Sequence, residues 1–290
     1  SSAPTAARIP GNLHQIWFGR EPVPKSCGLW SQLAKDEDDV DYTIWTEDTK
    51  EPDLLDIVGC EPNSFKRRSD IYRLQLLYKY GGVYIDADII PLPSYSKRFY
   101  NRISEYVCRD SVGHVFGVCQ EKRGLISNAF IVSTKENPII RKLLHYIERN
   151  YSHKGKTWMV TGPKVLTDFL INNGHVTHTK DFTMIGSEGV TILPSYSFNC
   201  GLDIAHLLSN RSLTVGHILR IKNNKDVNFL KYGNVIDHKL IFAVHLWFGG
   251  DSRKYNNFSN DMVETVTENF DMYMFYLGKV CDNSGNRKVY

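Results

Sequence analysis

The chain has 290 residues, of which 42% are hydrophobic and 23% charged, a composition typical of a folded globular protein rather than a disordered or fibrous one. Its 35 basic and 32 acidic side chains leave a formal net charge of only +3, which is too small for a surface that tracks a polyphosphate. No stretch approaches the roughly 20 continuous apolar residues that a membrane span requires. Nucleic acid and a membrane span within this chain are therefore not expected.

Six cysteines lie far apart and never form C-x-x-C, which argues against a zinc knuckle or a thioredoxin motif. Whether they are paired stays open, and so does the compartment, either the cytoplasm or the lumen of the Golgi or endoplasmic reticulum with an anchor removed. Because no repeat or linker divides the sequence, we expect a single domain over residues 1–290, with residues 1–8 disordered or added.

The predicted elements alternate between short β-branched or aromatic runs and longer helical patterns. In chain order the sequence predicts strands at 13–18 and 42–45, a helix at 64–80, strands at 83–86, 115–120 and 129–133, helices at 138–151 and 163–173, strands at 190–193 and 240–246, and a helix at 261–276. The acidic run at 36–39 is expected to be a solvated loop. This rhythm predicts the α/β class, with a mostly parallel central sheet flanked by helices.

The predicted strand at 83–86 ends in two carboxylates, Asp86 and Asp88, and it directly follows a helix that Gly81-Gly82 is expected to end. In an extended segment residues two apart point to the same side, so Asp86 and Asp88 are expected to project together. Carboxylate oxygens at a strand end suit Mg²⁺ or Mn²⁺. An Asp-x-Asp triplet alone is common and often marks only an exposed strand end, but the Gly-Gly helix stop before it favours a cation site.

The helix at 64–80 carries a second set of charges, because Arg67, Asp70 and Arg73 recur at three-residue spacing along one side. One interpretation is a ladder of helix ion pairs worth a few tenths of a kcal/mol. The other is a ligand role, which Ile71 and Leu74 favour because they flank Asp70 and imply that its face is partly buried. A buried ion pair gains little over apolar packing, so it more often serves a ligand.

The stretch from Ser69 to Asp88, with Gly81-Gly82-Val83-Tyr84-Ile85-Asp86-Ala87-Asp88, closely resembles the donor-sugar-binding core of glycosyltransferase family 32. That group includes the yeast initiating mannosyltransferase and the α-1,4-galactosyltransferases, and the stretch also resembles the clostridial glucosylating toxins. The resemblance extends from Ile9 to about Trp247 through weaker blocks, namely Ile9-Pro10-Gly11-Asn12-Leu13-His14-Gln15-Ile16-Trp17-Phe18-Gly19, Ser127-Asn128-Ala129-Phe130, Thr161-Gly162-Pro163 and His245-Leu246-Trp247.

The resemblance implies a GT-A fold and a metal-dependent transfer from a nucleotide sugar to a glycan or protein hydroxyl, with retention of anomeric configuration. The donor would be a UDP-sugar in preference to a GDP-sugar, and the cation Mn²⁺ or Mg²⁺. The residues that the resemblance assigns to the donor are Trp17 against the base, Asp70 and Arg73 on the sugar hydroxyls, Tyr84, Asp86 and Gly162. Asp86, Asp88 and His245 would hold the metal, and Asp86, Asp88 and Asn128 are the catalytic candidates.

The chemistry can also be considered without the family. A departing nucleoside diphosphate develops negative charge, which a divalent cation and basic side chains can stabilise without proton transfer. Lys66-Arg67-Arg68, Lys164, Arg253 and Lys254 could assist, although each is more simply a solvated charge. No paired carboxylates for a double displacement are recognisable, which favours attack of the acceptor on the same face as the leaving phosphate. Two alternatives stay open, a metal-dependent phosphohydrolase and a nucleotide-sugar-binding module without turnover.

Overall fold

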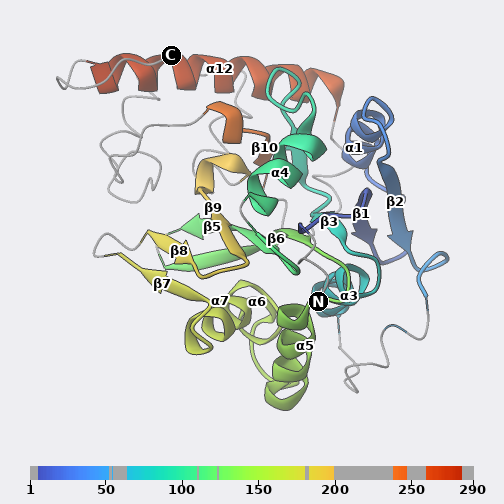
Figure 1. Cartoon of the computed structure of the whole chain (residues 1–290). Helices are drawn as coiled ribbons and strands as arrows, with labels where there is room; N and C mark the ends of the chain where they lie inside the picture. Colours follow the sequence, from blue (N-terminus) through green and yellow to red (C-terminus); the bar gives the residue numbers. More distant parts are fainter. Residues whose placement is uncertain are drawn as a thin grey trace.

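The computed structural model describes residues 6–51, 54, 64–109, 111–122, 124–179, 183–198, 238–246 and 259–282. At its centre is a six-stranded sheet with the order β2-β1-β3-β6-β5-β9 (Figure 1). Three of its five strand pairings are parallel, and the two that involve β6 with β3 and with β5 are antiparallel. The strands are β1 (Asn12–Trp17), β2 (Asp41–Thr46), β3 (Gly82–Ile85), β5 (Phe116–Lys122), β6 (Leu125–Ser133) and β9 (Val190–Leu193).

Helices cover both faces of this sheet. The helices of the described residues are α1 (Lys25–Lys35), α3 (Phe65–Tyr80), α4 (Phe99–Cys108), α5 (Pro138–Asn150), α6 (Thr157–Val160), α7 (Pro163–Asn172) and α12 (Asn260–Asp282). One hydrophobic cluster joins the sheet to α3, α5 and α7, and a second joins it to α1 and α4. The neighbours Val83 and Tyr84 of β3 belong to different clusters, because successive strand residues point to opposite faces.

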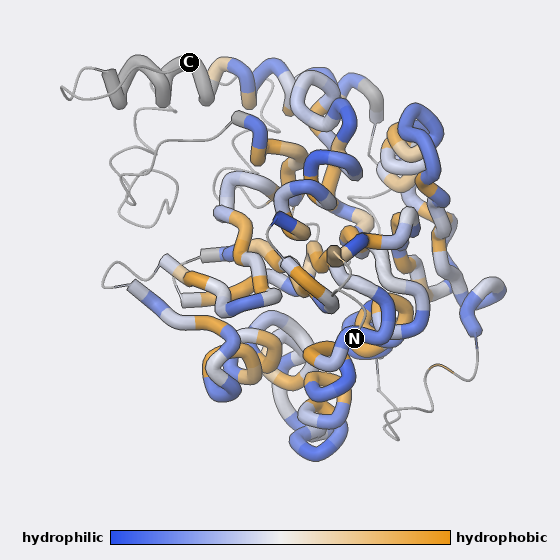
Figure 2. The backbone as a smooth tube through the Cα atoms, in the orientation of Figure 1, coloured by the Kyte–Doolittle hydropathy of each residue, from blue (hydrophilic) through white to orange (hydrophobic). Residues whose placement is uncertain are grey.

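In Figure 2 the hydrophobic residues, drawn in orange, lie on the strands and on the sides of the helices that face them. The predicted α/β class, with a mostly parallel sheet flanked by helices, is confirmed. In the described part of the chain no helix combines the length and the apolar character needed to cross a bilayer.

The junction between α3 and β3 forms as the sequence predicts. Ser64 caps the start of α3 by accepting the backbone N–H of Arg67 at 3.2 Å, and Gly81 and Gly82 end it with φ angles of 67° and 103°. A side chain at Gly82 would have its Cβ 2.1 Å from the Asn12 carbonyl oxygen. Only glycine therefore lets β3 enter the sheet beside β1 immediately after the helix.

Some elements differ from the prediction, chiefly where structure depends on distant partners. The strand expected at 240–246 is a 3₁₀ turn (His238–Leu240) followed by the shorter strand β10 (Ala243–His245). β10 pairs antiparallel with β4 (Ile89–Pro91), and β7 (Val176–His178) pairs with β8 (Met184–Gly186). Three-residue strands carry too little pattern to be recognised alone, and α1, α4 and α6 were also missed.

The acidic run at 36–39 is not simply a solvated loop, which corrects the prediction. The Glu37 carboxylate is half-buried and accepts the backbone N–H groups of Tyr100 and Asn101 in the first turn of α4. Burial raises the pKa of this carboxyl, and these hydrogen bonds oppose the shift. A carboxylate at a helix N-terminus is stabilised by the free N–H groups there.

The predicted N-terminal extension, residues 1–8, is described from Ala6 onward. Ala6 forms an isolated antiparallel bridge with Val112, and the backbone N–H of Ala7 donates to the Ser111 carbonyl at 3.2 Å. These described residues therefore lie against the loop that follows α4.

His14 in β1 is held by two hydrogen bonds inside the fold, and its burial makes the stability of the fold depend on pH. Its Nδ1 accepts the indole N–H of Trp45 at 3.2 Å, so its Nε2 carries the proton and donates to the Gly81 carbonyl at 3.0 Å. Burial lowers the pKa of His14 to about 4 from its usual 6.5. The fold therefore holds the ring neutral.

Between about pH 6.5 and pH 4 the His14 imidazole binds a proton in the unfolded chain but stays neutral in the folded protein. The free energy of unfolding is therefore expected to decrease as pH falls through this range. The loss attributable to this residue is on the order of 3 kcal/mol, and it levels off below the folded pKa. Urea unfolding across this range should show a steeper dependence in the native sequence than in His14→Gln. Equal dependences in the two proteins would contradict this assignment.

Candidate functional site

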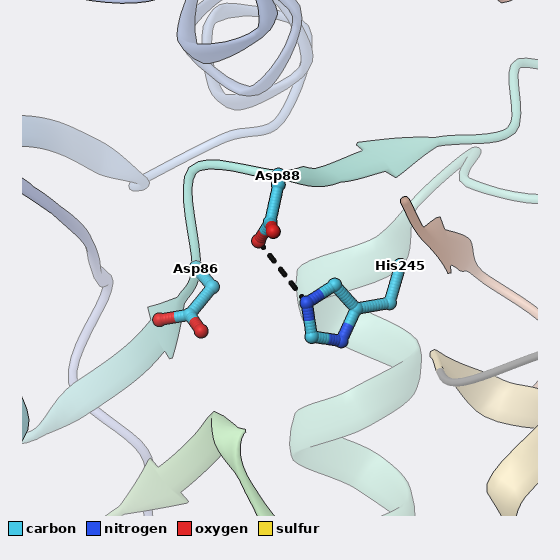
Figure 3. A group of neighbouring side chains, drawn as sticks. All are labelled: Asp86, Asp88 and His245. Carbon is cyan, nitrogen blue, oxygen red and sulfur yellow. Dashed lines mark ion pairs between the residues drawn. The ribbon is translucent and has the colours of Figure 1, made fainter. Parts of the chain in front are cut away.

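The two carboxylates after β3 lie in a turn rather than in an extended strand. β3 ends at Ile85, and the backbone N–H of Ile89 donates to the Asp86 carbonyl at 3.1 Å, which closes a turn over Asp86 to Ile89. The prediction that Asp86 belongs to the strand is therefore wrong, and strand alternation is not what brings Asp86 and Asp88 together. The turn nevertheless directs both side chains into one space (Figure 3).

His245 reaches the same space from β10. In the β4–β10 ladder His245 is paired with Ile89, and the backbone N–H of Leu246 donates to the Asp88 carbonyl at 2.8 Å. The imidazole Nε2 of His245 lies 3.1 Å from Oδ1 of Asp88, and both side chains are buried (Figure 3). Ligand atoms of Asp86, Asp88 and His245 all lie within 4.8 Å of one another.

Arg73 of α3 lies between Asp86 of this cluster and one further carboxylate, that of Asp70. Its guanidinium is 3.1 Å from Asp70 and 3.0 Å from Asp86, and only 5% of its side chain is exposed. It also donates to the Asn128 carbonyl at 2.6 Å and lies 4.4 Å from the centre of the Tyr84 ring. One buried cation therefore links the helix residue Asp70 to the turn residue Asp86.

Asp70 is held by hydrogen bonds from two other elements. Its Oδ1 accepts the Asn128 side-chain amide of β6 at 2.8 Å, and its Oδ2 accepts the Thr161 hydroxyl, just before α7, at 2.8 Å. The predicted burial of the Asp70 face is confirmed, since 9% of its side chain is exposed. In the sequence Thr161 stands out only as part of the block Thr161-Gly162-Pro163, and its contact with Asp70 is not predicted by that block.

The ionisation of these groups follows from burial and from their partners. Burial raises the pKa of the Asp70 carboxyl, while Arg73 and Thr161 oppose the shift. Burial alone would lower the pKa of His245, but the adjacent Asp88 carboxylate outweighs it and the pKa is raised. Burial also opposes the charge on Arg73, yet Asp86, Tyr84 and Asp70 raise its pKa and keep it a cation.

The remaining predicted residues occupy the surroundings of this cluster. Tyr84 is buried, and its hydroxyl donates to Asp86 at 2.6 Å. Gly162 precedes α7, where a Cβ would lie 2.8 Å from the Cα of Trp158, so only glycine fits without a shift.

Trp17 is half-buried at the end of β1 and donates its indole N–H to the Glu21 carbonyl at 2.9 Å. The structure thus joins Asp70, Arg73, Tyr84, Asp86 and Asn128 directly, with Trp17 at the same sheet edge.

The candidate phosphate-binding cations have other partners. Lys164 pairs with Asp168 one helical turn away at 2.6 Å. Arg68 makes a two-point contact with Glu47 at 2.9 and 3.0 Å. Arg67 is buried and donates to carbonyls of the segment 152–155. Arg253, Lys254 and Trp247 lie outside the described residues.

The donor set of the cluster fits a divalent cation. Two carboxylates and an imidazole combine the oxygen ligands that Mg²⁺ and Mn²⁺ prefer with a nitrogen ligand that Mg²⁺ seldom takes. The backbone N–H of Asp86 donates to Ala129, and those of Ile89 and Leu246 donate to the carbonyls of Asp86 and Asp88. The carboxylates therefore project from a backbone that is already hydrogen-bonded.

Comparison with known proteins places these residues in a described family region. Residues 26–107 match the family described as "Glycosyltransferase sugar-binding region containing DXD motif". The relative "Inositol phosphoceramide mannosyltransferase 3" of Schizosaccharomyces pombe is 32% identical over 91 residues, which cover 29% of this chain and 25% of the relative. The chain therefore matches about a quarter of that relative's length.

Two solved structures are also similar. "PaToxG Glycosyltransferase" shares 23% identity over 57% of this chain and 70% of its own, with a TM-score of 0.43. The ligand-free glycosyltransferase domain from the YGT toxin shares 11% identity over 92% of this chain and 99% of its own, with a TM-score of 0.42.

The family match contains α3, β3 and the turn with Asp86 and Asp88, which are the residues that carry the resemblance seen in the sequence. That prediction is confirmed for this part of the chain. Residues 26–107 match the glycosyltransferase sugar-binding region that contains the DXD motif, and Asp86 and Asp88 lie within this match.

Proposed function

We propose that this protein is a glycosyltransferase that moves a hexose from a nucleotide sugar to a hydroxyl of a glycan or a protein, with a divalent cation as cofactor. The observation that carries the proposal is the meeting of Asp86, Asp88 and His245 beside the buried Asp70–Arg73 pair, within or next to the matched sugar-binding region. An α/β sheet with this site at a strand end also fits the GT-A fold that the resemblance implies.

The residues divide into two functional groups in this proposal. Asp86, Asp88 and His245 would hold Mn²⁺ or Mg²⁺, which when bound supplies positive charge for the diphosphate leaving group. Asp70 would accept hydrogen bonds from donor-sugar hydroxyls, and Arg73 would fix Asp70 and Asp86 relative to each other. Trp17, half-buried at the carboxyl end of β1, would stack on the base, and Gly162 would allow close approach to the sugar.

The geometry favours transfer on one face of the sugar. Asp70 already accepts hydrogen bonds from Asn128 and Thr161 and pairs with Arg73, which leaves about one of its four acceptor sites for a sugar hydroxyl and makes it a poor nucleophile. Asn128 carries an amide, which is a poor nucleophile. We therefore propose retention by attack of the acceptor beside the leaving phosphate, and a glycosyl-enzyme adduct trapped and detected by mass spectrometry would contradict it.

The alternatives make different demands on the site. A phosphohydrolase with two metals would need a second cluster of carboxylates or histidines, and the described residues hold one such cluster, Asp86 with Asp88 and His245. A binding module without turnover would tolerate loss of the metal ligands, whereas here both carboxylates of the DXD motif are present. We also propose that the chain forms one catalytic domain.

A thermal-shift panel tests the proposal and the donor class together. UDP, GDP and their common sugars are compared with Mn²⁺ or with EDTA, and UDP-sugars are expected to give the larger shift. A ligand at about a hundred times its dissociation constant stabilises by about 2.7 kcal/mol, which raises the melting temperature visibly. The name of the yeast relative concerns mannosyl transfer, so mannose donors belong in the panel. If no nucleotide shifts the protein with any metal, the donor-site proposal is wrong.

A further inference from the structure

Helix α1 lies against the turn that carries the two carboxylates, and two of its side chains contact the backbone of that turn. The Ser26 hydroxyl donates to the Ala87 carbonyl at 2.8 Å, and the Trp30 indole N–H donates to the Ile89 carbonyl at 2.7 Å. Both donors have an exposure of 0%. Neither residue belongs to the cluster of candidate ligands.

The two donors lie on one face of the helix, and they contact two carbonyls of the same turn. Ser26 and Trp30 are four residues apart on α1, so they lie on one helix face about 6 Å apart along the axis. Ala87 and Ile89 are two residues apart in the chain, and their carbonyls accept these two donors at 2.8 and 2.7 Å. One face of a rigid helix therefore fixes two points of the turn at once.

The Ser26 hydroxyl donates its proton to the turn rather than to the backbone of its own helix. α1 begins after Pro24 without a side-chain cap, although Ser26 lies in its first turn, where a serine commonly bonds to nearby backbone. Its donation to Ala87 is a contact between residues 61 positions apart in sequence. The contact therefore serves the turn and not the start of the helix.

The other carbonyls of the turn are held as well, each by a different element. Asp86 accepts the Gln15 amide of β1 at 3.3 Å, and Tyr42 of β2 orients that glutamine by donating to it at 2.8 Å. Asp88 accepts the backbone N–H of Leu246 at 2.8 Å. The directions of four successive carbonyls, from Asp86 to Ile89, are thus fixed by hydrogen bonds. The backbone that they fix also determines where the Asp86 and Asp88 side chains point.

We propose that Ser26 and Trp30 are positioning residues of the metal site, which set the separation of the Asp86 and Asp88 carboxylates by holding the carbonyls of Ala87 and Ile89. The inference rests on the proposed function, because it assumes that these carboxylates bind a divalent cation. Loss of a partner that orients metal ligands typically weakens metal affinity by about 10- to 100-fold.

The test compares two buried serines that differ in what they hold. Ser26→Ala removes the hydroxyl bonded to Ala87, and Ser133→Ala removes an equally buried hydroxyl that donates to the Thr134 carbonyl at 2.9 Å, at the far end of β6 from the site. Free Mn²⁺ is titrated against each protein and followed by electron paramagnetic resonance, and melting temperatures are recorded. Ser26→Ala is expected to raise the Mn²⁺ dissociation constant by about tenfold or more, whereas Ser133→Ala leaves it within about twofold.

A second variant, at Trp30, allows the proposal to be tested even if Ser26→Ala fails to fold. Trp30→Phe retains an aromatic ring to pack against Phe99, whose ring centre lies 5.1 Å away, and removes the N–H that holds Ile89 together with part of the indole ring. It is expected to weaken Mn²⁺ binding in the same direction. Mn²⁺ affinities that stay unchanged in both variants, with the native protein binding normally, would overturn the positioning role alone. A native protein that does not bind Mn²⁺ would overturn the proposed metal site and this inference with it.

Discussion

Replacing Arg73 with methionine is expected to be the most destabilising single change among the described site residues, at about 3–5 kcal/mol. The guanidinium is buried and contacts Asp70 and Asp86 at 3.1 and 3.0 Å, so its removal leaves two carboxylates without their counter-charge. A loss of this size is a large part of the stability of an ordinary domain. Urea unfolding of the two proteins at pH 7.5 measures it.

A matched control separates this effect from the loss of any arginine. Arg68 also contacts a carboxylate at two points, but that pair with Glu47 is partly exposed, at 19% and 29% of the two side chains. Arg68→Met is therefore expected to cost no more than about 1 kcal/mol. Similar losses for the two variants would contradict the account of Arg73.

The deficit of Arg73→Met should also depend on pH in a defined direction. Burial already raises the pKa of Asp70, and removing the guanidinium that opposes this shift raises it further. A carboxyl whose folded pKa lies above its unfolded value costs stability at high pH; the cost declines as pH falls through the folded pKa and is gone below the unfolded value. The deficit is therefore expected to be larger at pH 8 than at acidic pH. Adding Asp70→Asn to the variant should recover part of it at pH 8.

Replacing Asp88 with asparagine is expected to give the largest loss of turnover, on the order of 10³-fold in kcat/KM. The change keeps the size of the side chain but removes the charge that both pairs with His245 at 3.1 Å and is proposed to bind the cation. Loss of several kcal/mol of electrostatic stabilisation at the leaving group corresponds to about this factor. Release of free nucleotide from the donor identified in the thermal-shift panel provides the assay.

Asp168→Asn is the control for this prediction, because the Asp168 side chain is 40% exposed and pairs with Lys164 one turn away in α7. Its turnover should stay within about twofold of the native protein. Raising the Mn²⁺ concentration is expected to restore part of the activity of Asp88→Asn, since the change weakens cation binding. An Asp88→Asn protein that keeps more than a tenth of native turnover would exclude Asp88 as a ligand required for the reaction.

The local part of this site could be predicted from the sequence. Ser64, the apolar spacing of α3 and the Gly81-Gly82 stop all act within a few residues, so they define the helix and the start of β3. The burial of Asp70 also followed from its neighbours on the helix. These signals predict the path of the chain as far as Asp86. The turn that follows depends on partners elsewhere in the chain, and the sequence alone predicts a continued strand there.

The non-local part could be named only through the resemblance or was missed. His245 reaches Asp88 because β10 pairs with β4, and a three-residue strand gives no register in the sequence. Thr161 bonds to Asp70 across 91 positions of sequence, and Ser26 bonds to Ala87 across 61. Serine and threonine are compatible with many environments, so neither residue type nor spacing distinguishes these two from other polar residues of the chain.

The most direct test of the metal site is anomalous diffraction at the manganese edge from crystals soaked with Mn²⁺ and UDP. The structure predicts one strong anomalous peak bonded by carboxylate oxygens of Asp86 or Asp88 and by the His245 imidazole, with the diphosphate completing its coordination. A cation bound elsewhere, or UDP bound with no cation between the diphosphate and these three side chains, would contradict the account.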